Sequence, residues 1–170
     1  GLTLTNFRNY ARTRLDIAAG PVVLTGANGA GKTNLLEAIS FLAPGRGLRG
    51  AKLAEVGRQD SVTRAPSSSW GVASTIAGPD GTVDVGTGLT PATPGRRIVQ
   101  INGQPAKGGA SIARQLSVVW LTPAMDRIFL DGPSGRRKFI DRLVTAFDAD
   151  QAGRIAAYDH AHRTKVCGVA

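Results

Sequence analysis

The sequence predicts an α/β fold in which a mixed sheet with an antiparallel section precedes a helical lobe. Three observations predict it. A glycine-rich loop at 26–33 lies between an apolar run and a helical pattern, alternation at 69–104 is typical of short strands, and an apolar stripe at 133–147 is typical of a helix. With 170 residues, the chain is long enough for one domain with a sizeable core.

The N-terminal segment predicts a hairpin followed by a buried strand. Apolar and polar residues alternate over 2–7 and again over 13–17, and a turn is expected at 9–11. Residues 22–24, Val-Val-Leu, are wholly apolar, which is typical of a strand buried on both faces. A helix is expected from residue 32 to the stop at Pro44-Gly45. The apolar side chains on its predicted face are Leu35, Leu36, Ile39 and Leu42.

The later part of the chain predicts further strands and two helices. Turns are expected at 79–81 and at Asn102-Gly103, with a loop at 86–95 between strands. Residues 118–121, Val-Val-Trp-Leu, predict a second buried strand. A helix should follow Gly132-Pro133, and Asp148 is a candidate cap for a last helix that runs toward Lys165. The apolar face of the first of these helices comprises Phe139, Ile140, Leu143, Val144 and Phe147.

The loop at 26–33 has the Walker A spacing of two glycines separated by four residues and followed by Lys and Thr. Glycines allow backbone N–H groups to approach phosphate oxygens, and the start of the following helix favours an anion. Lys32 is the candidate catalytic residue, placed to reach the β- and γ-phosphates, and the Thr33 hydroxyl is the candidate Mg²⁺ ligand. The predicted ligands of Mg·ATP are Gly26, Asn28, Gly29, Ala30, Gly31, Lys32, Thr33 and Asn34.

A complete ATPase also needs a strand that ends in an acid, to help hold Mg²⁺ and orient water. Residues 128–131, Ile-Phe-Leu-Asp, are the only candidate, and the Gly-Pro that follows Asp131 favours a loop and helix cap. The chain is therefore predicted to bind nucleotide better than it hydrolyses it. Met125 is the only methionine, which suggests a piece of a longer protein.

The net charge of +9 and the pI near 10.8 favour a polyanionic partner such as DNA, although an even spread of arginines over the surface is an alternative. The basic residues at 136–138, in the predicted helix, are candidates for contacts with DNA phosphates. A solvated basic face is the alternative explanation for them, because Arg137 and Asp141 are four residues apart and are spaced to pair. The single cysteine, Cys167, and the lack of an apolar run of membrane-spanning length predict a cytoplasmic protein with no membrane partner. The candidate DNA contacts are Arg46, Arg49, Arg136, Arg137 and Lys138.

Several segments together resemble the RecF family of bacterial DNA-repair ATPases, over about residues 2–160. The match is carried by Asn6-Phe7-Arg8-Asn9-Tyr10, by the P-loop and helix at 28–39, by Gly45-Arg46-Gly47-Leu48-Arg49, by 101–103 and 118–123, and by the Arg-Arg helix at 132–141. Residues 163–170 do not continue the long charged helix that the family has at that point.

The resemblance implies an ABC-type ATPase head, related to those of SMC proteins and Rad50, that dimerises on ATP and binds DNA at gaps. It implies a lobe I at 1–106, the start of a helical lobe II at 107–170, and signature and Walker B segments beyond residue 170. It also implies a RecR-like partner, and nucleotide contacts by Arg8 and Asn9. The expected function is ATP-dependent DNA binding in recombinational repair.

Other interpretations of the sequence remain open. A small P-loop kinase or an SMC- or Rad50-like head would share the loop, and a basic nucleic-acid-binding module would carry it by accident. A GTPase is disfavoured because no Asn-Lys-x-Asp motif is present. ATP binding separates the non-enzymatic module from the others.

Overall fold

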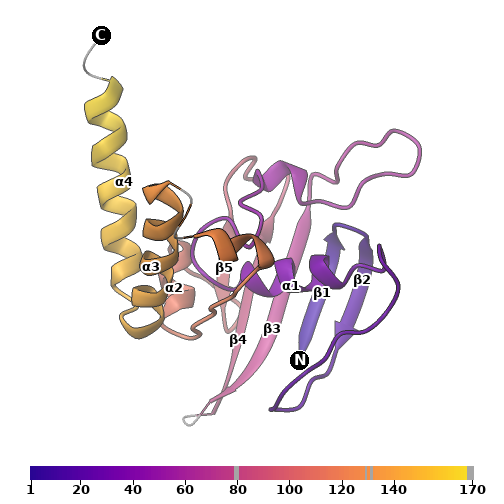
Figure 1. Ribbon diagram of the computed structural model, residues 1–170. Coiled ribbons are helices and arrows are strands. Elements are labelled where there is room, and N and C mark those ends of the chain that lie inside the picture. The colour runs from indigo at the N-terminus through magenta and orange to yellow at the C-terminus, as the bar shows by residue number, and fades with distance from the viewer. Residues whose placement is uncertain (79–80, 129, 131, 168–170) are drawn as a thin grey trace.

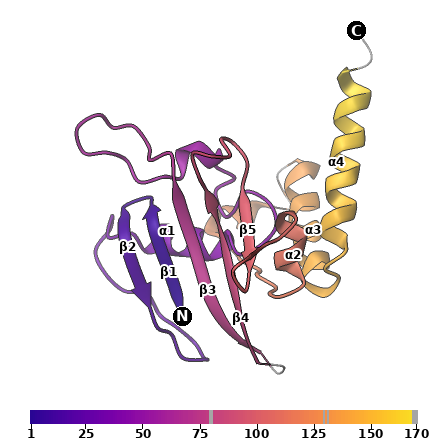
Figure 2. The ribbon, with the colours of Figure 1, turned by 180° about the vertical axis from the view of Figure 1, so that it is seen from behind.

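The computed structural model describes residues 1–78, 81–128, 130 and 132–167. A single twisted sheet forms the body of the molecule, one helix crosses its face, and three helices gather beyond one edge (Figures 1 and 2). The strands lie in the order β2-β1-β3-β4-β5-β6, and every pairing is antiparallel. They are β1 (Leu2–Phe7), β2 (Tyr10–Leu15), β3 (Trp70–Gly78), β4 (Gly81–Leu89), β5 (Ile98–Ile101) and β6 (Gln104–Pro105).

The predicted hairpins are present, with small shifts in their bounds. β2 begins at Tyr10, so the first turn is Arg8-Asn9 and lies one residue earlier than predicted. Asn102 and Gly103 both have positive φ, 49° and 75°, as a two-residue turn of this hand requires. β4 runs on to Leu89, so the loop predicted from residue 86 is wrong over its first part. It continues because Thr87 faces inward with its apolar neighbours and donates its hydroxyl hydrogen to Ile98 O, 3.0 Å away.

The core lies between the sheet and α1 (Lys32–Ser40) and is centred on an aromatic cluster. The Phe7, Phe41 and Trp70 rings pack with centroids 5.0–5.8 Å apart. Edge-to-face pairs of this kind stabilise by about 0.5–1.5 kcal/mol each beyond the area they bury. The indole N–H of Trp70 donates to Leu53 O, so the one polar atom of the ring is also satisfied. The cluster fixes the end of β1, the end of α1 and the start of β3 against one another.

Two predicted buried strands are not strands, which corrects the mixed-sheet prediction. Val22 and Val23 are 54% and 83% exposed, and Val119 and Leu121 are 45% and 77% exposed. An apolar run signals a need for burial, but a strand forms only where a neighbouring strand accepts its backbone hydrogen bonds. Within the described residues no strand pairs with either run. Both runs therefore lack ladder partners and are not part of the sheet.

The helical part contains the two predicted helices, but their apolar face is less buried than expected. α3 (Pro133–Phe147) carries Ile140 and Phe147 at 56% and 93% exposure, and Leu36 on α1 is also exposed, at 49%. The last helix, expected to run toward Lys165, ends at Cys167. No helix in the described part of the chain is both long and apolar enough to cross a bilayer. The helices are α2 (Gly108–Ala113), α3 (Pro133–Phe147) and α4 (Gln151–Cys167), with short 3-10 turns η1 (Leu53–Glu55) and η2 (Pro123–Arg127).

Candidate nucleotide-binding site

The glycine-rich loop folds around the ammonium group of Lys32. Gly26, Gly29 and Gly31 have φ values of 140°, 85° and 102°, which side chains rarely tolerate. The Lys32 Nζ donates to Gly26 O at 2.6 Å and to Ala27 O at 2.8 Å. The loop therefore holds a cation inside its own turn, next to the start of α1.

The start of α1 is open to an anion. Its N-cap, Gly31, provides no side-chain hydrogen bond, and its first turn has no acid. The first backbone hydrogen bond to this cap runs from Leu35 N to Gly31 O, so the amides of the first turn have no helical acceptor. Those amides, the helix dipole and Lys32 suit phosphate oxygens, and Thr33 is on the same turn. The residues present therefore fit the phosphates of a nucleotide with Mg²⁺ on Thr33.

The β1–β2 turn packs against this loop. The Tyr10 hydroxyl donates to Gly31 O at 3.2 Å, and Asn34 Nδ2 donates to Asn9 Oδ1 at 2.8 Å. A Cβ on Gly31 would lie 2.6 Å from Asn9 Nδ2 and 2.8 Å from the Tyr10 hydroxyl, so both side chains would have to shift to admit it. Asn9, a predicted nucleotide ligand, thus lies at the loop and is held by Asn34.

Behind the loop, the buried carboxylate of Glu37 accepts hydrogen bonds from two arginines. Glu37 is fully buried, and its two oxygens accept from Arg8 Nε at 2.9 Å and Arg8 Nη2 at 2.7 Å. Arg49 Nη1 donates to Glu37 Oε2 at 2.5 Å and to Asn34 Oδ1 at 2.8 Å. Arg8 also donates to Glu55 O through Nη1, so all three of its nitrogens are occupied by protein. In this structure Arg8 ties elements together, whereas Arg49 is 41% exposed and engaged through one nitrogen.

The sequence did not single out Glu37 or Arg97, although one signal was present for Glu37. Glu37 is an acid placed among the buried residues of an amphipathic helix. Arg97 lies at the far end of α1 and donates to Phe41 O, to Ala43 O and to Gly45 O. A cation at a helix C-terminus donates hydrogen bonds to carbonyls that have no partner within the helix, and it interacts favourably with the negative end of the helix dipole. Burial lowers the pKa of Arg97 to about 10, which still leaves it charged at neutral pH.

A family model described as the RecF/RecN/SMC N terminal domain matches residues 1–124. The chain belongs to this family. The resemblance to RecF seen in the sequence is thereby confirmed, and so is the head-like ATPase fold in its coarser form.

Curated family members support the same relationship. The chain is 48% identical over 163 residues to the DNA replication and repair protein RecF of Mesorhizobium japonicum, and 47% identical over 169 residues to that of Caulobacter vibrioides. These alignments cover 95% and 97% of this chain and 42% of each relative. The chain thus spans less than half the length of these relatives.

Solved structures of family members share the fold. The recombination mediator RecF with ATP superimposes with a TM-score of 0.79 at 27% identity, covering 97% of this chain and 44% of the other. An SMC ATPase described in work on ATP-driven dimerisation gives a TM-score of 0.62 at 24% identity, covering 84% of this chain and 96% of the other, and shows the fold alone.

The predicted DNA contacts lie in two separate regions of this structure. Arg46 is exposed and Arg49 belongs to the Glu37 cluster, both in the loop after α1. On α3, Arg137 pairs with Asp141 at 3.7 Å, as its spacing predicted, and its guanidinium lies 3.9 Å from the Tyr158 ring centroid. The hydrogen bond with Tyr158 is the main reason that the pKa of Arg137 is raised. Lys138 on the same helix is exposed.

The candidate Walker B acid lies outside what can be described. Residues 129 and 131 are not among the described residues, so the prediction that Asp131 belongs to a loop and cap is untested. The turn before it is η2, which carries Asp126 on its exposed side. None of the strands in the described ranges ends in an aspartate.

Proposed function

We propose that this chain is the Mg·ATP-binding part of a RecF-type recombination mediator that binds DNA in an ATP-dependent manner. One observation carries the proposal. Lys32 is held inside a loop of positive-φ glycines at the uncapped start of α1, and this is an arrangement that binds phosphate. The similarity to a RecF structure with ATP supports the same ligand.

The residues of the loop have distinct parts in binding. The amides of the first turn of α1 and Lys32 bind the β- and γ-phosphate oxygens, and the Thr33 hydroxyl binds Mg²⁺. The metal, when bound, neutralises charge that develops on the phosphates. Tyr10 and Asn9 hold the loop from the side through Gly31 and Asn34. Nucleotide contact by Arg8 requires release of at least part of its ion pair with Glu37.

The relatives are more than twice as long as this chain, so the wider function is proposed for the full length that they span. We propose lobe I at 1–106 and the start of lobe II at 107–170, an ATP-dependent homodimer, a RecR-like partner, and DNA at gaps as the substrate. A cytoplasmic location follows from that role. Support for DNA comes from the net charge of +9 and from the role of the relatives in DNA replication and repair.

Replacement of Lys32 by Ala tests the proposal. Charge-assisted hydrogen bonds contribute about 1.5–3 kcal/mol, so the affinity for Mg·ATP should fall by roughly ten- to a hundredfold, measured by calorimetry. The thermal unfolding transition should be unchanged because the Lys32 ammonium contacts only loop carbonyls. Lys107→Ala, which removes a lysine at the start of α2, is the matched control. Equal ATP affinity in both variants would refute the nucleotide site.

A further inference from the structure

A small ordered hairpin at residues 57–67 projects from the body of the molecule (Figure 1). We call it the basic arm. Its two sides meet at an isolated bridge between Gln59 and Pro66, and Asp60 N donates to Ala65 O at 2.9 Å. At its tip, Asp60 Oδ1 accepts the amides of Val62 at 2.9 Å and Thr63 at 2.8 Å. The turn is therefore closed by its own hydrogen bonds and does not depend on packing.

The root of the basic arm is anchored firmly. Arg58 N donates to Asn6 O at 2.7 Å, and Gly57 forms a bridge with Phe7 at the end of β1. Gly57 is buried, and a Cβ there would lie 2.2 Å from Ser67 O, so the two sides of the root are in close contact. The arm is held in one position relative to the sheet and to the β1–β2 turn.

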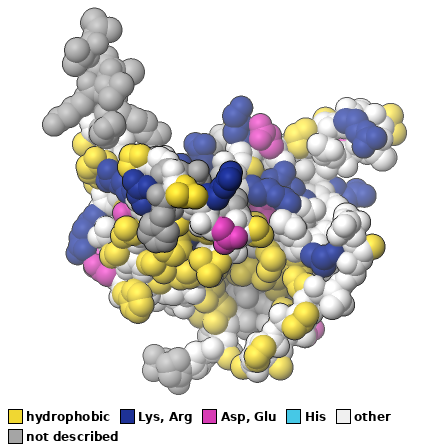
Figure 3. Space-filling view, viewed as in Figure 1, with side chains coloured by type: hydrophobic (Ala, Val, Ile, Leu, Met, Phe, Trp, Pro, Cys, Tyr) yellow, Lys and Arg dark blue, Asp and Glu magenta, His cyan; other side chains and the backbone are white. Residues whose placement is uncertain are grey.

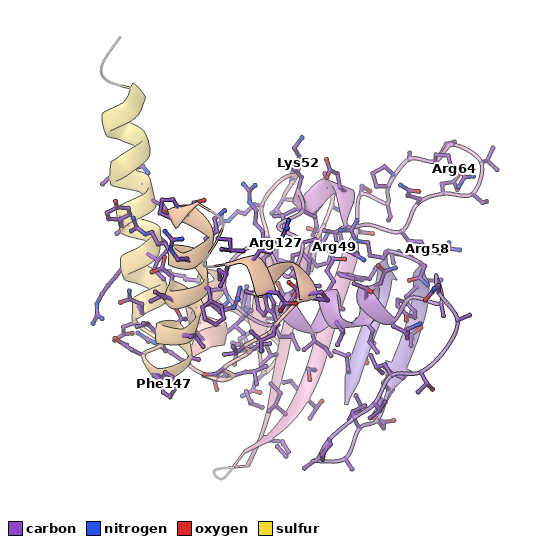
Figure 4. The ribbon with its side chains drawn as sticks, in the orientation of Figure 1. Arg49, Lys52, Arg58, Arg64, Arg127 and Phe147 are labelled. Carbon is purple, nitrogen blue, oxygen red and sulfur yellow. The ribbon has the colours of Figure 1, made fainter. Side chains whose placement is uncertain are left out.

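The basic arm presents two arginines that the rest of the described structure does not use. Arg58 near the root and Arg64 near the tip are exposed and visibly separated along it (Figure 4). Neither guanidinium forms a hydrogen bond or ion pair within the described residues. The one acid of the arm, Asp60, is committed to the turn. Its pKa is lowered first by the backbone hydrogen bonds from Thr63 and Val62, with the Arg58 charge as the weakest cause.

Many other surface arginines have acidic partners. Arg14, Arg114 and Arg154 each pair with an aspartate. On α3, Arg137 pairs with Asp141 and lies against Tyr158. Since a paired or stacked arginine must give up an interaction to bind phosphate, the arm offers cations at lower cost than the α3 cluster does.

Further basic side chains lie on the same face as the arm. In Figure 4, Lys52 is labelled at the top of the body and Arg49 over the middle of the body, and basic side chains gather across the upper part of this face in Figure 3. Lys52 is 80% exposed, with only a long ion pair to Glu55 at 3.7 Å. A ligand bound to the arm therefore has a further exposed cation, Lys52, on the same face.

We infer that the basic arm binds the phosphate backbone of DNA, through Arg58 and Arg64. This inference rests on the proposed DNA binding and names its surface. A continuous polyanion suits separated, unpaired guanidinium groups, because each can bind a different phosphate and release a counterion. An arm whose one large exposed apolar side chain is Val62 offers little to a protein partner, whose interface would need buried anchors.

The test uses the full-length protein with Mg·ATP and a short duplex, with affinity measured over a range of salt concentrations. The variant Arg58→Gln/Arg64→Asn removes both charges, and Asn suits the positive φ of 58° at position 64. The slope of log affinity against log salt should fall by about 0.9 for each phosphate that the variant no longer neutralises. Arg12→Gln/Arg154→Gln removes the same charge from β2 and α4 and should leave the slope nearly unchanged. Arg58→Lys/Arg64→Lys, which keeps the charge, should retain most of the slope.

The outcomes separate this inference from the function on which it rests. If the unaltered protein binds no DNA, the proposed function fails. If it binds DNA and the arm variant has the same slope as the unaltered protein or the control, only the arm assignment is overturned. Unchanged thermal unfolding and Mg·ATP affinity in the arm variant would exclude a folding defect. If the arm variant does have such a defect, the salt slope of the lysine variant is compared with that of the unaltered protein instead. A selective fall in slope, preserved by lysine, establishes the arm as a DNA contact.

Discussion

Arg8 and Glu37 form a bidentate ion pair that joins the β1–β2 turn to the helix following the nucleotide-binding loop. The carboxylate is fully buried and the Arg8 side chain is 20% exposed. Both Glu37 oxygens are used by Arg8, and one is shared with Arg49. A buried charge is tolerated only when it is paired in this way, so the three side chains depend on one another.

Replacement of Glu37 by Ala should destabilise the protein by about 3 kcal/mol, because it leaves Arg8 largely buried without its partner. Glu37→Gln keeps the shape and loses the charge, so its cost should be smaller. Urea unfolding measures both. Glu55→Ala is the control, since that side chain is exposed and forms only a long ion pair, and it should change stability by less than about 0.5 kcal/mol. Similar costs for Glu37→Ala and Glu55→Ala would show that the cluster does not stabilise the fold.

Two glycines of the loop should respond differently to Ala. Gly31→Ala brings a Cβ into Asn9 and Tyr10, whereas a Cβ on Gly29 meets nothing within 4 Å. Both positions have positive φ, so the backbone strain of about 1–2 kcal/mol is common to the pair. We expect Gly31→Ala to lower Mg·ATP affinity and melting temperature more than Gly29→Ala does. Equal effects of the two variants would contradict the packing of the β1–β2 turn on the loop.

Arg97→Met should destabilise the fold by about 2 kcal/mol, because carbonyls at the end of α1 lose a charged donor. The loss is partly offset because a half-buried cation is removed at the same time. Arg96→Met, at the exposed neighbouring position, should lie within about 0.5 kcal/mol of the unaltered protein. Chemical unfolding of the two variants gives the comparison. An Arg97→Met variant as stable as Arg96→Met would mean that the helix end needs no such cap.

The 170-residue chain by itself should show negligible ATP turnover. It spans 42% of its relatives, and among the described residues no strand ends in an aspartate that could complete the metal site. A steady-state phosphate-release assay checks this. A rate on the order of 1 s⁻¹ would mean that an acid within this chain completes the site, and Asp131→Asn would then be the first variant to measure.

Local sequence patterns were sufficient to predict the turns and helices that are determined by a few neighbouring residues. The Asn102-Gly103 turn needs two positive φ values, and the loop before Lys32 needs glycines where the chain bends back on itself. Both are specified by a few adjacent residues. The helix from Lys32 and the first hairpin follow from short-range periodicity in the same way.

The tertiary structure alone decided the contacts between distant parts of the chain. Arg8, Glu37 and Arg49 come from three segments, and no spacing rule predicts that one carboxylate serves both arginines. The apolar runs at 22–24 and 118–121 show the converse. Their composition indicates a strand, but a strand exists only where a neighbour supplies its backbone hydrogen bonds, and no described strand pairs with either run. Sequence determines which groups need partners, whereas the fold determines which partners they meet.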